Sequence, residues 1–196
     1  IIKTVLRAVE RYLMISTEGV MSARVDETSF LITPTGMDRG SLEITDLVLI
    51  KDGHRERGKL PSRSVRLHRA IYDTHPGIQC AITAQSPHIL AYAITCCPID
   101  TRSIPESYVM LRDIPMVPYG TQFKAPQEIA DIVSVHKPVV LLQNDAVLTT
   151  GTSIYQAFDR LEVAEATAKV LLDTAHIGPV VPIGDQELEE LERAYF

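Results

Sequence analysis

The apolar positions of this chain repeat with two periods that alternate along its length. From Ile2 to Leu13 they recur every three or four residues opposite charged positions, which predicts an amphipathic helix over residues 2–15. The period then shortens at residues 22–25 and 29–33, which predicts two strands joined by a short polar hairpin connection.

The same alternation continues to the end of the chain. Ser153 with Gln156 predicts a capping box for the longest helix, which the Gly178-Pro179 pair should end. The further expected strands lie at 47–50, 78–83, 116–119, 139–142 and 147–150, and the further helices at 62–74, 86–94, 126–135, from 153 onward, and 185–194.

Interleaved helices and strands of this kind predict an α/β fold in which helices cover a central sheet. The hairpin signals favour a sheet that is mostly antiparallel. No internal repeat or linker divides the sequence, so we expect a single domain over residues 1–196. Because the chain begins at Ile1 and not at Met, we expect an N-terminal piece to be missing from it.

Composition narrows the classes of function. The net charge is -6 and the 19 basic residues are scattered, which argues against a nucleic-acid-binding surface. No apolar stretch reaches the length of a membrane span. Three cysteines without any CxxC pair form a poor disulfide framework and favour a reducing compartment, so we expect a cytoplasmic protein with no membrane partner.

Several short segments, taken in order, resemble the class II aldolase and adducin family. They cover about residues 2 to 175, and each is weak alone whereas the ordered set is specific. The resemblance implies a three-layer α/β/α domain, commonly assembled as a homo-oligomeric ring of four with active sites between subunits. The segments are Gly19-Val20-Met21-Ser22, Phe30-Leu31-Ile32-Thr33-Pro34-Thr35-Gly36, His68-Arg69-Ala70-Ile71-Tyr72, Ser86-Pro87, and Leu141-Leu142-Gln143-Asn144 followed by Thr149-Thr150-Gly151.

Family enzymes hold a zinc ion with three histidines and stabilise an enediolate on it, and the resemblance maps these ligands onto Thr83, Gln85 and Asp145. The family's catalytic glutamate maps onto Ser64. A hydroxyl, an amide and one carboxylate make a poor zinc site, because zinc prefers imidazole or thiolate ligands. We therefore expect no zinc cofactor, or at most a weakly bound cation.

Phosphate binding is the family property that the sequence retains best. The resemblance assigns it to Gly19, Thr35, Gly36, Ser62 and Arg63, while the family's asparagine after the first glycine is a valine here. Free amides at a helix N-terminus and a nearby arginine favour an anion. The alternative is that the Thr-Pro-Thr-Gly segment is only a turn and Ser62 only a helix cap.

Two functions therefore compete at this stage. The first is a noncatalytic domain with a ligand-binding, regulatory or assembly role, in the manner of the adducin head, with a small phosphorylated ligand. The second is a lyase or epimerase acting on a sugar phosphate or a related carbonyl compound, with Asp145 as base and Arg63 or Tyr119 as an electrophilic helper. Tyr119 matches a proton-donating tyrosine of some family aldolases, but it also suits a packed interface position.

Overall fold

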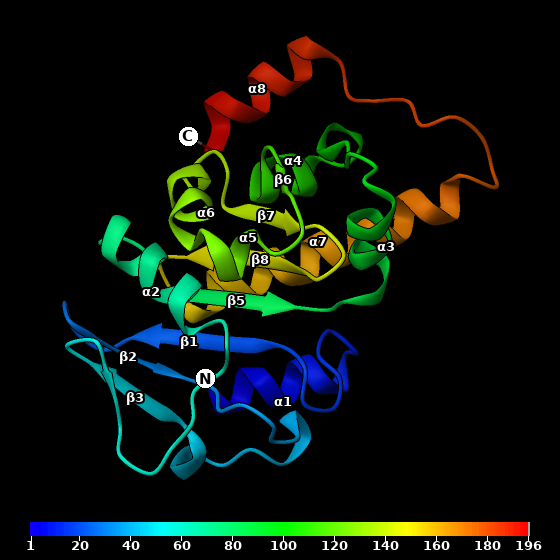
Figure 1. Cartoon of the computed structure of the whole chain (residues 1–196). Coiled ribbons are helices and arrows are strands. Elements are labelled where there is room, and N and C mark those ends of the chain that lie inside the picture. The colour runs from blue at the N-terminus through cyan, green and yellow to red at the C-terminus, as the bar shows by residue number, and fades with distance from the viewer. Residues whose placement is uncertain (196) are drawn as a thin grey trace.

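An eight-stranded sheet runs through the molecule and carries helices on both of its faces (Figure 1). The computed structural model describes residues 1–195. The strand order is β4-β3-β2-β1-β5-β8-β7-β6, and within the described residues only β6 and β7 pair in parallel, which confirms the mostly antiparallel sheet. The strands are β1 (Val20–Arg24), β2 (Ser29–Ile32), β3 (Val48–Lys51), β4 (His54–Arg55), β5 (Cys80–Ala84), β6 (Met116–Val117), β7 (Val139–Leu142) and β8 (Ala146–Gly151).

The helices divide into two layers, each built around its own apolar core. Helices α1, α3, α4 and α7 pack on one face of the sheet, and α2 and α6 pack on the other. This arrangement confirms the three-layer α/β/α architecture. The helices are α1 (Ile2–Glu10), α2 (Val65–Thr74), α3 (Pro87–Thr95), α4 (Pro105–Leu111), α5 (Thr121–Lys124), α6 (Pro126–Ile132), α7 (Ile154–Thr174) and α8 (Asp185–Tyr195).

Strand β5 shows how the sequence separates the two cores. It lies between β1 and β8 and is buried along its whole length, so both of its faces carry small or apolar side chains. Cys80 and Ile82 join the core beneath α7, whereas Ala81 joins the core beneath α2. The central position of β5 places its last residues deep in the molecule, next to the start of α2.

Some boundaries differ from the sequence prediction. Helix α1 ends at Glu10 and not near residue 15, because Tyr12 takes a left-handed conformation with φ of 58°. Helix α2 begins at Val65 and not at Ser62, whose hydroxyl instead accepts the amide hydrogen of Ser64. The sequence pattern predicts neither strand β4 nor helices α4 and α5.

The start of α7 follows the prediction closely. The Ser153 hydroxyl accepts the amide hydrogen of Gln156 at 3.1 Å, as an N-cap should. The Gln156 side chain reaches back to the amide of Thr152 and not to that of Ser153, so the reciprocal half of the capping box is displaced by one residue. The helix ends at Thr174, a few residues before the Gly178-Pro179 pair.

None of the helices within residues 1–195 is long and apolar enough to cross a membrane. The three cysteines are free, with Cys80 buried and Cys96 and Cys97 exposed.

Candidate functional site

A cavity of about 270 Å³ opens between the end of β5, the start of β1 and the residues that precede α2. All five residues assigned to phosphate binding line it: Gly19, Thr35, Gly36, Ser62 and Arg63. Residues from separate segments of the chain therefore meet at one place.

Gly19 shapes one wall of the cavity through its backbone. Its φ of +89° is rarely adopted by other residues, and a Cβ atom there would lie 2.6 Å from Cγ of Met14. The Gly19 carbonyl accepts a hydrogen bond from Nε of Arg39 at 2.7 Å. The glycine therefore allows the chain to pass close to Met14 while it holds an arginine at the cavity.

Arg39 is a cavity residue that the sequence analysis missed. Its side chain is 1% exposed, and besides Gly19 it donates to the carbonyl of Met37 at 2.7 Å. Burial lowers the pKa of Arg39, while the charges of Glu18 and Asp38 oppose that shift. An arginine stays protonated in proteins, so it brings a permanent positive charge to the cavity wall. The available sequence signal was a single arginine three residues after the Thr-Gly turn.

Three further groups supply donors at the same wall. Arg63 stacks over the ring of Phe123, with its guanidinium carbon 5.6 Å from the ring centroid, and both residues line the cavity. Ser62 is almost fully buried and accepts the amide hydrogen of Ser64, which leaves its own hydroxyl hydrogen for a ligand. Gly36, with φ of +69°, lies at the exposed rim.

The residues at the family's ligand positions also line this cavity. Thr83 is at the end of β5, Gln85 follows it, and Asp145 precedes β8, while Ser64 occupies the glutamate position. The Thr83 hydroxyl lies 3.2 Å from Nε2 of His68. The structure therefore brings together the three ligand positions and the glutamate position of the resemblance.

This donor set does not fit a zinc ion. The Thr83 hydroxyl already has a buried histidine partner, and Oδ2 of Asp145 accepts a hydrogen bond from Gln122 at 2.7 Å. Oε1 of Gln85 is buried without a hydrogen-bond partner in the described chain. One carboxylate with a hydroxyl and an amide lacks the imidazole or thiolate ligands that zinc requires. Residues 1–195 also contain no cluster of three His, Cys, Asp or Glu side chains that could hold a metal.

The surroundings of Asp145 shift the pKa of its carboxyl group. Burial raises its pKa, an effect opposed by the hydrogen bond from Gln122 and the positive charge of Arg63, and reinforced by the negative charge of Glu18. The carboxyl is half-buried in the cavity, so its protonated form is favoured more than that of an exposed aspartate. It is the group here best suited to hold or move a proton.

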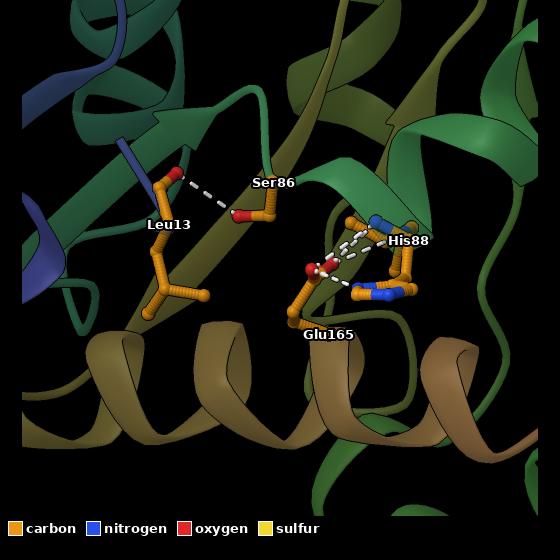
Figure 2. Close-up of polar contacts among 5 residues, drawn as sticks. Leu13, Ser86, His88 and Glu165 are labelled. Carbon is orange, nitrogen blue, oxygen red and sulfur yellow. Dashed lines mark hydrogen bonds and ion pairs between the residues drawn. The ribbon is translucent and has the colours of Figure 1, made fainter. Parts of the chain in front are cut away.

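The residues that follow Gln85 are held by polar contacts of Ser86 and His88, as Figure 2 shows. The Ser86 hydroxyl donates to the carbonyl of Leu13 at 3.0 Å. The carboxylate of Glu165 on α7 accepts the amide hydrogens of His88 and Ile89, and it also contacts Nδ1 of His88 at 2.7 Å (Figure 2). Because Ser86 does not cap α3, Glu165 takes over that role from another helix and fixes the chain that leaves β5.

Tyr119 is not brought to the site. Its side chain is 64% exposed and is not among the described residues that line the cavity. Its amide donates to Oε1 of Gln143. The remaining histidines also lie elsewhere, and His75, for example, contacts the carbonyl of Ala130 on α6.

Comparison with known proteins gives a consistent picture. The family model for the class II aldolase and adducin N-terminal domain matches residues 1–172. The chain is 29% identical to L-fuculose phosphate aldolase of Escherichia coli strain K12, over 96% of this chain and 88% of that protein. It is also 29% identical to 3-oxo-tetronate 4-phosphate decarboxylase of Haemophilus influenzae, over 93% of this chain and 90% of that protein.

Solved structures agree at the level of the fold. An L-fuculose 1-phosphate aldolase superimposes with a TM-score of 0.86 at 25% identity, covering 100% of this chain and 94% of that one. The L-fuculose-1-phosphate aldolase of Thermus thermophilus gives a TM-score of 0.77 at 21% identity, covering 91% of this chain and 95% of that one.

Proposed function

This chain belongs to the class II aldolase and adducin family, and we propose that its cavity binds a small phosphorylated sugar or sugar acid without zinc-dependent cleavage of that ligand. One observation carries the proposal: the five phosphate-binding positions and Arg39 line the same cavity as the three replaced zinc ligands. This arrangement supports the proposal that the phosphate-binding half of the family site is retained and the metal-binding half is lost.

The charges of the cavity support binding of a phosphate. Arg39 and Arg63 line it together with Ser62 and the Thr-Gly turn, where hydroxyl and amide donors are available. Guanidinium groups bind phosphate oxygens through charge-assisted hydrogen bonds. Asp145 lines the same cavity, and its ionised form favours an uncharged part of the ligand beside it.

Calorimetric titration with inorganic phosphate and with L-fuculose 1-phosphate tests this proposal. Arg63→Met should weaken binding of both ligands about five- to twentyfold, since it removes a charge-assisted hydrogen bond of about 1.5 kcal/mol or more. Arg66→Met, in the first turn of α2, is the matched control, because Arg66 is exposed and outside the cavity, and it should bind like the wild type.

The metal part of the proposal needs a separate measurement. Elemental analysis of the purified chain should find far less than one zinc per chain, and added zinc should not start cleavage of L-fuculose 1-phosphate. Stoichiometric zinc, or cleavage that depends on it, would contradict the proposal.

A second candidate function is metal-independent proton transfer at Asp145, and the raised pKa of this half-buried carboxyl favours it. Decarboxylation or epimerisation of a phosphorylated keto acid would use Asp145 to move a proton, with Arg63 near the developing charge. Asp145→Ala should then abolish turnover while phosphate binding persists. No turnover of such substrates by the wild type would leave only the binding function.

The assembly of the chain can also be predicted. The family resemblance predicts a homo-oligomer, expected to be a tetramer, in which the exposed Tyr119 would lie at an interface between subunits. Light scattering on the purified chain measures this directly, and a monomer at micromolar concentration would be the contrary result.

A further inference from the structure

A chain of four buried side chains leads from the cavity into the core beneath α2. The Thr83 hydroxyl contacts Nε2 of His68 at 3.2 Å, and Nδ1 of His68 contacts Oγ of Ser22 at 2.7 Å. Oγ of Ser22 in turn lies 2.6 Å from the hydroxyl of Tyr72. His68 and Ser22 are fully buried, and Thr83 and Tyr72 nearly so. Of the four, only Thr83 lines the cavity.

His68 is neutral in this setting. Complete burial lowers its pKa to about 3, so at neutral pH the imidazole carries a single proton. A neutral imidazole donates from one nitrogen and accepts at the other. The hydrogen bonds among these four side chains can therefore run in only two ways, with each group donating either toward Tyr72 or toward Thr83.

Tyr72 decides between these two directions. Its hydroxyl is buried, and burial raises its pKa so that it stays protonated. The hydrogen-bond partners of this hydroxyl in the part of the chain that the structure describes are Oγ of Ser22, which can accept, and the amide of Ala81, which can only donate. If Ser22 donated to Tyr72, the phenolic hydrogen would be buried without an acceptor, which is strongly unfavourable. Tyr72 therefore donates to Ser22, and Ser22 donates to Nδ1 of His68.

The direction of these hydrogen bonds is then fixed as far as the cavity. With Nδ1 accepting, the His68 proton is on Nε2 and is donated to the oxygen of Thr83. The Thr83 hydroxyl hydrogen has no acceptor among residues 1–195, and its side chain lines the cavity. This hydrogen is left for a ligand.

We infer that the Tyr72-Ser22-His68 relay makes Thr83 a hydrogen-bond donor to a carbonyl oxygen of the phosphorylated ligand, and so a specificity-determining residue. The inference deepens the proposed function and rests on it. Asp145 in the same cavity disfavours a carboxylate at this position, so a ketone or aldehyde oxygen is the acceptor that fits best. His68, Ser22 and Tyr72 act as positioning residues, since they reach the ligand only through Thr83.

The test compares two probes that differ at one carbon. Dihydroxyacetone phosphate has a carbonyl group where 1,3-propanediol monophosphate has a methylene group, which cannot accept a hydrogen bond, and inorganic phosphate lacks both. Calorimetric titration of the wild-type chain should show tighter binding of the carbonyl probe by about three- to tenfold, the range of one net hydrogen bond.

Two substitutions at the cavity isolate the donor. Thr83→Val keeps the side-chain shape but removes the hydroxyl, so it should bring the two probes to within about twofold of each other while phosphate binds as before. Thr83→Ser restores a hydroxyl and should restore the preference. A structural role for Thr83 alone would not predict this rescue.

Tyr72→Phe tests the relay from its far end. The substitution removes the first donor without touching the cavity, so the preference for the carbonyl probe should fall and the His68 proton should be shared between both ring nitrogens. Tyr155→Phe, at an exposed tyrosine on α7, is the control and should change neither. Nitrogen-15 NMR of the histidine side chains reports the protonated nitrogen directly, and the wild type should show Nε2.

The possible results distinguish failure of this inference from failure of the proposed function. A wild-type proton on Nδ1 of His68, or equal binding of the two probes while phosphate binds, would overturn the inference. Failure of inorganic phosphate itself to bind would refute the proposed function and with it the ligand part of this inference, whereas the proton position at His68 is measured without any ligand.

Discussion

Glu165 should be one of the residues on which stability of the fold depends most, although it lies on the surface helix α7. Its carboxylate accepts the amide hydrogen of Ile89 at 2.9 Å, that of His88 at 3.1 Å, and contacts Nδ1 of His88 at 2.7 Å. Helix α3 has no side-chain cap of its own. Glu165→Ala would leave the first amides of α3 without acceptors.

The expected loss of stability in Glu165→Ala follows from three overlapping effects. Loss of an N-cap destabilises by about 1 kcal/mol, a hydrogen bond to a charged group contributes about 1.5–3 kcal/mol, and a carboxylate at a helix N-terminus contributes about 0.3–1 kcal/mol. Because these describe the same contacts, they do not add fully. We expect the free energy of unfolding to fall by about 2–3 kcal/mol, which lowers the Tm by roughly 4–12 °C in a chain of this size.

Glu162 provides a matched control on the same helix. Its side chain is 17% exposed against 13% for Glu165, but among residues 1–195 it pairs only with the exposed arginines Arg7 and Arg11. Surface ion pairs of this kind contribute less than about 1 kcal/mol. Urea unfolding at one protein concentration measures both variants, and a Glu165→Ala loss no greater than that of Glu162→Ala would refute the capping role.

Three further predictions concern the cavity and the sheet. Histidines placed at Thr83, Gln85 and Asp145 together should give one tightly bound zinc per chain by elemental analysis, because they supply three imidazole ligands; binding no stronger than that of the wild type would show that the geometry has changed too. Asp145→Asn should tighten sulfate binding at pH 7 about three- to tenfold by removing one like charge, roughly 1 kcal/mol. Since the pKa of Asp145 is raised, its ionisation destabilises the fold. The stability that this group contributes is therefore present at low pH and lost as the pH rises through that pKa. The asparagine variant should not show this loss of stability. Gly151→Ala would place Cβ 2.5 Å from the amide nitrogen of Ala157, so denaturant unfolding should show a loss of about 1–3 kcal/mol, and a neutral result would mean that α7 shifts easily.

Local sequence signals predicted the elements whose hydrogen bonds close within a few residues. The N-cap at Ser153 is such a case, since Gln156 lies three residues away and both partners are read from one short window. Helix α4 was missed because it has only seven residues and little periodicity, and its Leu111 is buried in a core that residues from distant helices and strands build together. The start of α2 was placed too early because Ser62 turns its hydroxyl to the amide of Ser64 before the helix begins.

The candidate site was predictable only where a family motif marked it. The Thr-Gly turn and Ser62 were found by their neighbours in sequence, whereas Arg39 has no motif and reaches the cavity through the carbonyl of Gly19, 20 residues away. The contact between Thr83 and His68 spans 15 residues, and that between Ser22 and Tyr72 spans 50. Such contacts depend on the sheet register that pairs β1 with β5, which no local pattern specifies.

The exchange of ligands at the cavity changes the chemistry that it can support. A zinc ion would supply several kcal/mol of charge stabilisation to an enediolate. One hydroxyl donor at Thr83, directed by a neutral His68, offers at most the effect of a single oxyanion-hole donor, about 2.7–4 kcal/mol. The charge of Asp145 acts against any oxyanion that forms beside it, unless that carboxyl is protonated. Because this negative charge opposes the donor at Thr83, the proposed function predicts that the cavity binds its ligand without cleaving a carbon-carbon bond.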